Sequence, residues 1–262
     1  MKKFIGILIA VMLTGVLAAC GSSENTSNDA AGYTLVEDGK FTFAASGEFK
    51  PFSVTDPKGV MSGFDIEVGE AVAEKLGLEP VQKKFKFAGI VEGVKTGRFD
   101  AAIASHTITD KRLEQVDFST PYYYSGPQIF VRGDSSVETL ADLEGLEIAV
   151  SKGSTYAETA AEVTDNIIQY DSDVTALEAL SKGRHDAVIT DFITGKEAIG
   201  AGMSIEGREL LGRSEQAIAI AKDNTELLNK VNEALQELRE DGTLKAISVK
   251  YFGEDITADP EK

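Results

Sequence analysis

The sequence has a single cysteine, Cys20, so no disulfide can form within one chain. It has only two histidines, His106 and His185, which lie 79 positions apart and do not form a cluster of metal ligands. It also has no phosphate-cradling glycine loop and no nucleophile elbow. We therefore expect no metal, no cofactor and no catalytic residues, and predict that the chain is not an enzyme.

Basic residues are scarce as well, because 26 lysines and arginines face 43 aspartates and glutamates, for a net charge of −17. Such an acidic surface repels nucleic acid phosphates and anionic lipid, so no nucleic acid partner is expected. Beyond the first twenty residues, no segment approaches the length needed to span a membrane. With 42% hydrophobic residues, the chain has enough apolar material for one large core or two smaller ones.

The N-terminus has the layout of a secretory signal: two lysines, an apolar stretch from Phe4 to Leu17, and then small residues. This stretch is too short to be a stable transmembrane helix. The end of the stretch, LAAC at residues 17–20, resembles the bacterial lipobox, in which the cysteine is lipidated after cleavage. We predict a signal peptide at residues 1–19 and a lipid anchor on Cys20, which places the protein on the extracytoplasmic face of a bacterial cell membrane.

Residues 21–32 read GSSENTSNDAAG and contain almost no large apolar side chains. Such a segment cannot bury enough surface to fold, so we predict that residues 20–32 form a lipidated, flexible tether. The folded part is then expected to begin near Tyr33.

From residue 41 onward, short apolar runs typical of strands alternate with stretches of helical periodicity. Strands are expected at residues 41–45 and 101–104, with a helix between them for which Asp65 is a plausible N-cap and Gly77 the end. The pattern returns with expected strands at 148–150, 167–170 and 187–190. This alternation predicts mostly parallel sheets flanked by helices.

The two halves also share a local motif, GRFDAAI at residues 97–103 and GRHDAVI at residues 183–189. We interpret this match as a two-lobe pseudo-repeat. Lobe 1 is expected to hold residues 33–125 and 216–253, lobe 2 residues 126–215, and a tail residues 254–262. The chain would then cross between the lobes twice, which is the geometry of a hinge.

Parallel sheets present their ligand sites beyond the carboxyl ends of their strands. In lobe 1 that end carries Ser105, His106 and Thr107, and in lobe 2 it carries Asp191. If the lobes face each other, both strand ends border one cleft.

Three segments together resemble the family 3 extracellular solute-binding proteins: GFDIEV at residues 63–68, TITDKR at 107–112 and VDFSTPYY at 116–123. The resemblance extends over residues 41–253. It implies a type II periplasmic-binding-protein fold, α/β with two lobes and a two-strand hinge. It also implies a free polar amino acid as ligand, an ABC permease with its ATPase as partner, and a monomeric state.

The resemblance assigns the ligand carboxylate to Arg112, whose planar guanidinium suits a bidentate pair. The alternative is that Arg112 is an ordinary surface arginine exposed to solvent. Thr107 is expected to add donors to the same carboxylate, and Thr155, after Ser154, to offer a backbone N–H at a helix start. Asp191 would accept from the ligand ammonium with help from Ser105, so that one zwitterion joins the two lobes.

Phe49 and Phe87 stand where relatives carry residues that enclose the ligand side chain. Ser46 stands where several binders of basic amino acids have an aspartate, which argues against a strongly basic ligand, although Glu48 could still reach in. His106 could either bond a polar ligand or pack under the cleft, and His185 is interpreted as a surface residue.

An alternative function comes from the same fold, which also serves as a periplasmic dehydratase of prephenate-like acids. Such an enzyme needs a general acid above its substrate. His106 and Glu48 are the only candidates that the sequence offers for this role.

Overall fold

The computed structural model describes residues 27–28 and 32–260. The predicted signal peptide and Cys20 lie outside the described residues. Within the predicted tether, β1 (Ser27–Asn28) pairs with β2 (Thr34–Leu35). No helix in the described part of the chain combines the length and the apolar character needed to cross a membrane.

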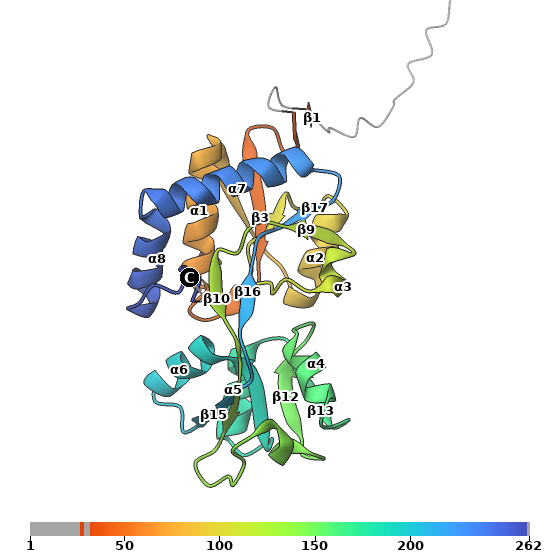
Figure 1. Cartoon of the computed structure of the whole chain (residues 1–262), viewed down its shortest axis with the longest axis vertical. Coiled ribbons are helices and arrows are strands. Elements are labelled where there is room, and N and C mark those ends of the chain that lie inside the picture. Colours follow the sequence, from red (N-terminus) through yellow and green to blue (C-terminus); the bar gives the residue numbers. More distant parts are fainter. Residues whose placement is uncertain (1–26, 29–31, 261–262) are drawn as a thin grey trace, which may run out of the picture.

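The first of the two lobes in Figure 1 is built on a five-stranded sheet. Its strands run in the order β7 (Glu79–Lys84), β3 (Lys40–Ala45), β8 (Ala101–Ala102), β17 (Ala219–Ala221) and β9 (Val116–Phe118). The first three strands are parallel, whereas β17 is antiparallel to both of its neighbours. A small antiparallel sheet of β4 (Glu48–Phe49), β5 (Ser53–Thr55) and β6 (Met61–Ser62) belongs to this lobe.

The second lobe repeats this plan. Its sheet has the order β13 (Ile167–Tyr170), β12 (Ile148–Ser151), β14 (Ala187–Asp191), β11 (Pro127–Val131) and β15 (Glu206–Leu210). Three parallel strands are again followed by an antiparallel one, here β11. In each lobe, the antiparallel strand is the first sheet strand after the chain has crossed between the lobes.

The crossing itself is a two-stranded ribbon. β10 (Tyr123–Ser125) and β16 (Ser214–Gln216) pair antiparallel, with Tyr123 opposite Gln216 and Ser125 opposite Ser214. Figure 1 shows this ribbon between the lobes. Two short segments that run side by side permit a rotation of the lobes, as a hinge requires.

Helices cover both sheets. Lobe 1 carries α1 (Phe64–Leu76), α2 (Phe87–Lys95) and α3 (Asp110–Leu113), and lobe 2 carries η1 (Leu140–Leu143), α4 (Tyr156–Ala161), α5 (Asp173–Ser181) and α6 (Phe192–Gly200). The last pair, α7 (Thr225–Glu240) and α8 (Thr243–Phe252), returns to pack on α1. This return agrees with the sequence prediction, since α7 buries the apolar stripe of Leu227, Val231, Leu235 and Leu238.

Two local predictions need correction. Helix α1 ends as expected at Gly77, in the left-handed conformation, but it begins after Gly63, so Asp65 is not its N-cap. Asp65 is buried instead. His185 is not a surface residue either: its ring lies between Glu147 Oε1 at 2.6 Å and the Tyr170 hydroxyl at 2.5 Å, and so links three neighbouring strand regions of lobe 2.

Candidate functional site

A cavity that is partly open to solvent lies between the lobes. Both lobes contribute to its wall. The lining residues are Ser46, Glu48, Phe49, Phe87, Ser105, Thr107 and Arg112 from lobe 1, and Ser151, Ser154, Thr155, Tyr156, Asp171, Ser172 and Asp173 from lobe 2. The wall therefore includes eight of the ten predicted binding residues, all except His106 and Asp191.

Arg112 projects from the short helix α3, which the Thr109 side chain caps by accepting a bond from the Arg112 backbone N–H. Its guanidinium donates to the Thr107 carbonyl at 2.7 Å and to the Gly153 carbonyl of lobe 2 at 3.1 Å. Burial lowers the pKa of Arg112. Because no carboxylate of the described residues forms an ion pair with it, Arg112 is a half-buried cation that lacks a counter-ion.

Ser105 is held in an unusual conformation at the end of the lobe 1 strand. Its φ of 58° is in the left-handed region, where non-glycine residues are uncommon and often functional. Its hydroxyl donates to Asp65 at 2.8 Å, and its backbone N–H donates to the Tyr122 hydroxyl, which in turn donates to Asp65 at 2.6 Å. The Ser105 oxygen can therefore still accept a hydrogen bond from a ligand.

Asp65 was missed as a supporting residue for this site. It is fully buried in α1, and burial raises the pKa of its carboxyl to about 6. Its two oxygens accept hydrogen bonds from the hydroxyls of Ser105 and Tyr122. Asp65 therefore orients Ser105, which lines the cavity. The sequence signal for this buried role was an acidic residue at the second helix position, between the apolar Phe64 and Ile66.

In lobe 2, the loop before α4 brings Ser154 and Thr155 to the cavity. The Ser154 hydroxyl donates to the Ser151 carbonyl at 2.7 Å, which fixes the turn. Thr155 directly precedes the helix, in the position expected for a residue that offers a backbone N–H to an anion. This role for Thr155 stays a prediction.

Asp173 is the buried one of the two carboxylates, with the exposed Asp171, that lobe 2 places on the cavity wall. It is the first residue of α5, and its Oδ1 accepts the Thr190 hydroxyl at 2.6 Å and the Ser151 hydroxyl at 2.9 Å. Burial raises the pKa of Asp173. No cation of the described residues forms an ion pair with it, so a cationic group in the cavity would stabilise its charged form.

Asp191, which the sequence prediction placed in contact with the ligand, does not line this cavity. It ends β14 and caps α6, accepting from the Ile193 backbone N–H at 2.9 Å and from the Ser125 hydroxyl of the hinge at 2.5 Å. Burial raises the pKa of Asp191 to about 7. Because its carboxylate is turned to the hinge strand, its contact with a ligand stays a prediction of the resemblance alone.

His106 is also absent from the cavity wall. Its ring stacks on Phe87 with 4.5 Å between ring centroids, and burial, followed by the charge of Arg112, lowers its pKa well below the usual value. It is therefore neutral and packs behind the aromatic wall, one of the two roles that the sequence left open. Its Nδ1 has no hydrogen-bond partner among the described residues.

Phe49 and Phe87 supply the aromatic wall of the cavity, and their contact with a ligand side chain stays a prediction. Phe49 stacks on Phe52 at 4.9 Å between ring centroids, and the Phe87 ring lies 5.9 Å from the Arg112 guanidinium carbon. Ser46 accepts from the Glu48 backbone N–H at 3.2 Å, so it shapes the strand that carries Phe49.

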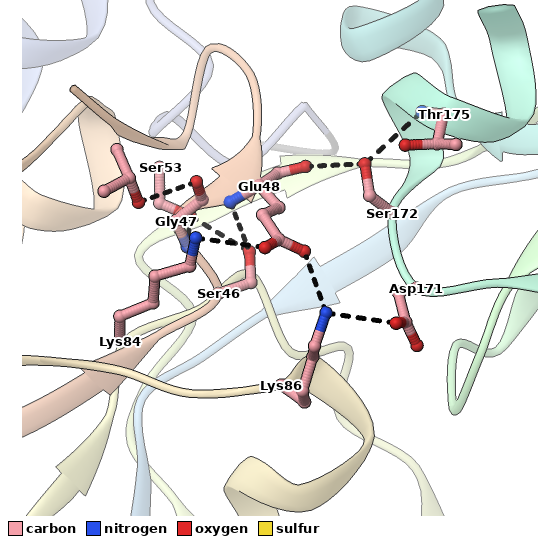
Figure 2. A network of polar contacts seen from close by, with 10 residues as sticks. Ser46, Gly47, Glu48, Ser53, Lys84, Lys86, Asp171, Ser172 and Thr175 are labelled. Carbon is pink, nitrogen blue, oxygen red and sulfur yellow. Dashed lines mark hydrogen bonds and ion pairs between the residues drawn. The ribbon is translucent and has the colours of Figure 1, made fainter. Parts of the chain in front are cut away.

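A polar network crosses between the lobes beside Ser46 (Figure 2). The Ser172 hydroxyl of lobe 2 donates to the Glu48 carbonyl at 3.1 Å. The Glu48 carboxylate pairs with Lys84 at 3.0 Å and with Lys86 at 3.6 Å, and Lys86 reaches Asp171 of lobe 2 at 3.0 Å. The two lobes are thus in direct contact around the cavity.

Sequence reasoning missed Asp171, Ser172 and Asp173 as site residues. The rule that points to them had already been applied to β14: ligands bind beyond the carboxyl ends of parallel strands. Strand β13 is parallel to β12 and ends at Tyr170, directly before these three residues. Applying the rule to every parallel strand would have found them.

The comparisons with known proteins agree with this geometry. The model of the bacterial extracellular solute-binding proteins, family 3, matches residues 41–254. The probable amino-acid-binding protein YxeM of Bacillus subtilis is 34% identical, over 99% of this chain and 98% of its own length. The L-cystine-binding protein TcyJ of Escherichia coli (strain K12) is 31% identical, over 98% of this chain and 97% of its own length.

A solved structure, described as the substrate binding protein of an amino acid ABC transporter, matches with a TM-score of 0.78 and 30% identity. It covers 82% of this chain and is itself covered completely. The fold is therefore the two-lobe, type II periplasmic-binding architecture that the sequence predicted. The chain belongs to family 3 of the bacterial extracellular solute-binding proteins.

Proposed function

We propose that this protein captures a free polar L-amino acid in the cavity between its lobes and delivers it to the permease of an ABC importer. One observation carries the proposal: the same cavity presents a guanidinium without a counter-ion from lobe 1 and a buried carboxylate without a counter-ion from lobe 2. An α-amino acid zwitterion supplies both missing charges.

The ligand carboxylate would bind Arg112 as a bidentate pair, with the Thr107 hydroxyl and the Thr155 backbone N–H as further donors. Arg112 is already oriented by the Thr107 and Gly153 carbonyls. Since Gly153 belongs to lobe 2, this arginine contacts both lobes when the cavity is closed.

The ligand ammonium would bind the Asp173 carboxylate, with the Ser105 oxygen as a second acceptor. Asp173 and Asp191 are close enough for each other's charge to matter, because Asp173 contributes to the raised pKa of Asp191. Asp191 would support the ammonium from behind after a rotation of its side chain. A cation between two buried carboxylates lowers the cost of ionising both.

Binding and lobe closure would be one event. Besides the Arg112–Gly153 contact, the Thr194 hydroxyl donates to the Lys50 carbonyl at 3.2 Å and Lys50 pairs with Glu197 at 2.8 Å, all across the cleft. Surface pairs of this kind contribute about 0–1 kcal/mol each. The ligand's buried charge pairs would therefore decide when the closed form is populated.

The relatives reported above are named as binding proteins, which supports a transport role over the dehydratase alternative. The two candidate general acids also fit that enzyme poorly. His106 lies behind Phe87 with a lowered pKa, and Glu48 is held by Lys84 and Lys86. Incubation with a prephenate-like acid is expected to give no aromatic product.

The membrane anchor on Cys20 and the extracytoplasmic location belong to the same proposal, and they rest on the signal-like N-terminus. A lipid on Cys20 would keep a monomeric binding protein close to its permease. Replacement of Cys20 by serine is expected to move the protein from the membrane fraction to the medium or periplasm, and retention in membranes would contradict the anchor.

Thermal unfolding against a panel of amino acids tests the capture function. A ligand at 100 times its Kd stabilises the folded protein by about 2.7 kcal/mol, which is a clear shift of the melting temperature. We expect a shift with one or a few polar amino acids. The absence of a shift with every amino acid would contradict the proposal.

A further inference from the structure

The cavity has two ends that differ in their contacts with lobe 2. At one end, Arg112 reaches Gly153, before α4. At the other, Glu48 is contacted by Ser172, before α5. A ligand that places its α-carboxylate on Arg112 would extend its side chain toward the Glu48 end, along the wall to which Phe49 and Phe87 contribute. The chemistry of that second end therefore selects the ligand.

The Glu48 end carries charges of both signs in equal number. Glu48 and Asp171 line the cavity, and they are paired with Lys84 and Lys86. Figure 2 shows that these four side chains converge from both lobes. Two carboxylates and two ammonium groups sum to zero, so the second end is charged but balanced.

This balance disfavours side chains that carry a single charge. An arginine-like or lysine-like side chain would have to displace Lys86 or Lys84 from Glu48, and the displaced ammonium would stay close by. A glutamate-like side chain would face both Glu48 and Asp171. In either case the network together with the ligand would carry a net charge, and its like charges would repel each other.

A group that carries both signs can join the network without changing its net charge. An ammonium can pair with Glu48 or Asp171 while a neighbouring carboxylate pairs with Lys84 or Lys86. This is the charge pattern of an α-amino acid group. The second end of the cavity would therefore bind such a group as the first end does, with positive and negative charges supplied by four side chains.

The network can open for such a group at low cost. The backbone of Glu48 is fixed by Ser46 and Ser172, whereas its carboxylate is held by lysines that are exposed to solvent. Exposed ion pairs contribute little to stability and exchange readily. Glu48 can thus keep its place in the wall while its carboxylate changes partner.

We propose that the preferred ligand is a bis(α-amino acid), a molecule with two zwitterionic ends joined by a short apolar linker. Arg112 and Asp173 would bind one end, the Glu48–Lys84–Lys86–Asp171 network the other, and Phe49 and Phe87 the linker between them. This inference rests on the proposed function, because it assumes that the first end binds as described above.

Calorimetric titration with matched ligands tests the proposal. Lanthionine has two α-amino acid ends on a thioether linker, and S-ethylcysteine has the same first end and sulfur but lacks the second end. We expect the wild-type protein to bind lanthionine at least about tenfold more tightly, as one charge-assisted contact can provide. S-(2-aminoethyl)cysteine and S-(2-carboxyethyl)cysteine, which keep one charge each, should both bind more weakly than lanthionine.

The variants Glu48→Gln and Lys86→Met should each reduce the lanthionine preference by roughly tenfold. Lys83→Met is the matched control, because Lys83 is an exposed neighbour for which no ion pair occurs among the described residues. It changes the net charge as Lys86→Met does, and it should leave the preference unchanged.

Three outcomes would overturn the inference. These are equal affinity of the wild type for lanthionine and S-ethylcysteine, a preference that survives Glu48→Gln and Lys86→Met, and an equal loss of affinity for both ligands, which would make the network only a closing contact. Binding of S-ethylcysteine without any preference would leave the proposed function intact. Binding of neither these ligands nor any other amino acid would contradict the proposed function itself.

Discussion

At the scale of single residues, the site consists of charges that the protein leaves without counter-ions. Arg112 is half-buried and oriented by two carbonyls, and Asp173 is buried and bonded only to hydroxyls. Each charge is unfavourable where it is until an opposite charge arrives. Such residues destabilise the empty cavity and thereby favour the filled one.

Asp173→Asn tests the lobe 2 half of this arrangement. The substitution keeps the shape of the side chain and can keep its hydroxyl partners, but it removes the negative charge. Loss of one partner of a buried charge pair costs about 2–5 kcal/mol of binding free energy. We expect calorimetry to show a corresponding loss of affinity, whereas Asp165→Asn on the lobe 2 surface should bind normally. Unchanged affinity of Asp173→Asn would remove it from the site.

The raised pKa of Asp191 predicts how the stability of the folded protein depends on pH. Its pKa is raised by burial from 3.8 to about 7, so the folded protein holds a proton that the unfolded chain releases near pH 4. Between about pH 4 and about pH 7, the native state therefore binds more protons than the unfolded state, and this group makes stability fall as the pH rises. Asp191→Asn removes that contribution.

Urea unfolding of the ligand-free protein across this pH range checks the sign. The free energy of unfolding of Asp191→Asn should decline less steeply with pH than that of the wild type, so that the variant gains relative stability toward pH 7. Parallel curves would show that the carboxyl of Asp191 titrates near its ordinary pKa in the folded protein.

At the scale of elements, the close approach of the loop before α4 to the first turn of α2 limits how far the lobes can close. Gly153, before α4, has a φ of +81°, and a β-carbon there would lie 2.9 Å from the Ala88 α-carbon of lobe 1. Gly145 has a similar φ of +73°, but a β-carbon there would meet nothing within 4 Å. The two glycines thus form a matched pair in one lobe.

We expect Gly153→Ala to weaken ligand binding by about tenfold or more, because the added methyl opposes closure as overpacking does in a core. Gly145→Ala introduces comparable backbone strain without the contact. It should therefore lower stability but leave the affinity unchanged in calorimetry. An equal effect of both substitutions on affinity would contradict a role of the loop contact in closure.

The sequence predicted most elements because strand, helix and glycine signals agree along this chain. Strand 167–170 and the end of α1 at Gly77 follow directly from such signals. Helix starts were less certain: Asp65 has the residue type of an N-cap, yet it is buried by tertiary packing between Ser105 and Tyr122. Local patterns do not contain that long-range contact.

The site residues likewise include some that sequence signals reveal and some that depend on contacts between distant segments. Arg112, Ser105 and Thr107 follow a strand end that the sequence makes visible, and the structure places them on the cavity. Asp191 is absent from the cavity wall because its side chain turns toward the hinge. Asp173 lies on the wall because β13, which ends just before it, pairs in parallel with β12. Both depend on which segments become neighbours in the folded protein.

At the scale of the whole molecule, two similar lobes around a two-strand ribbon divide the site between bodies that can move apart. Arg112 belongs to one lobe and Asp173 to the other, so neither lobe can bind a zwitterion well alone. Under the proposed function, capture of the ligand and closure of the lobes would depend on the same charge pairs.

Titration calorimetry of Arg112→Ala tests this account most directly, with an amino acid that binds the wild type as ligand. The exposed Arg184→Ala, which makes the same change on the lobe 2 surface, is the control. Removal of the guanidinium leaves the ligand carboxylate unpaired in the closed cavity, and we expect a loss of roughly 3–5 kcal/mol, more than a hundredfold in Kd. Near wild-type affinity of Arg112→Ala would contradict the account.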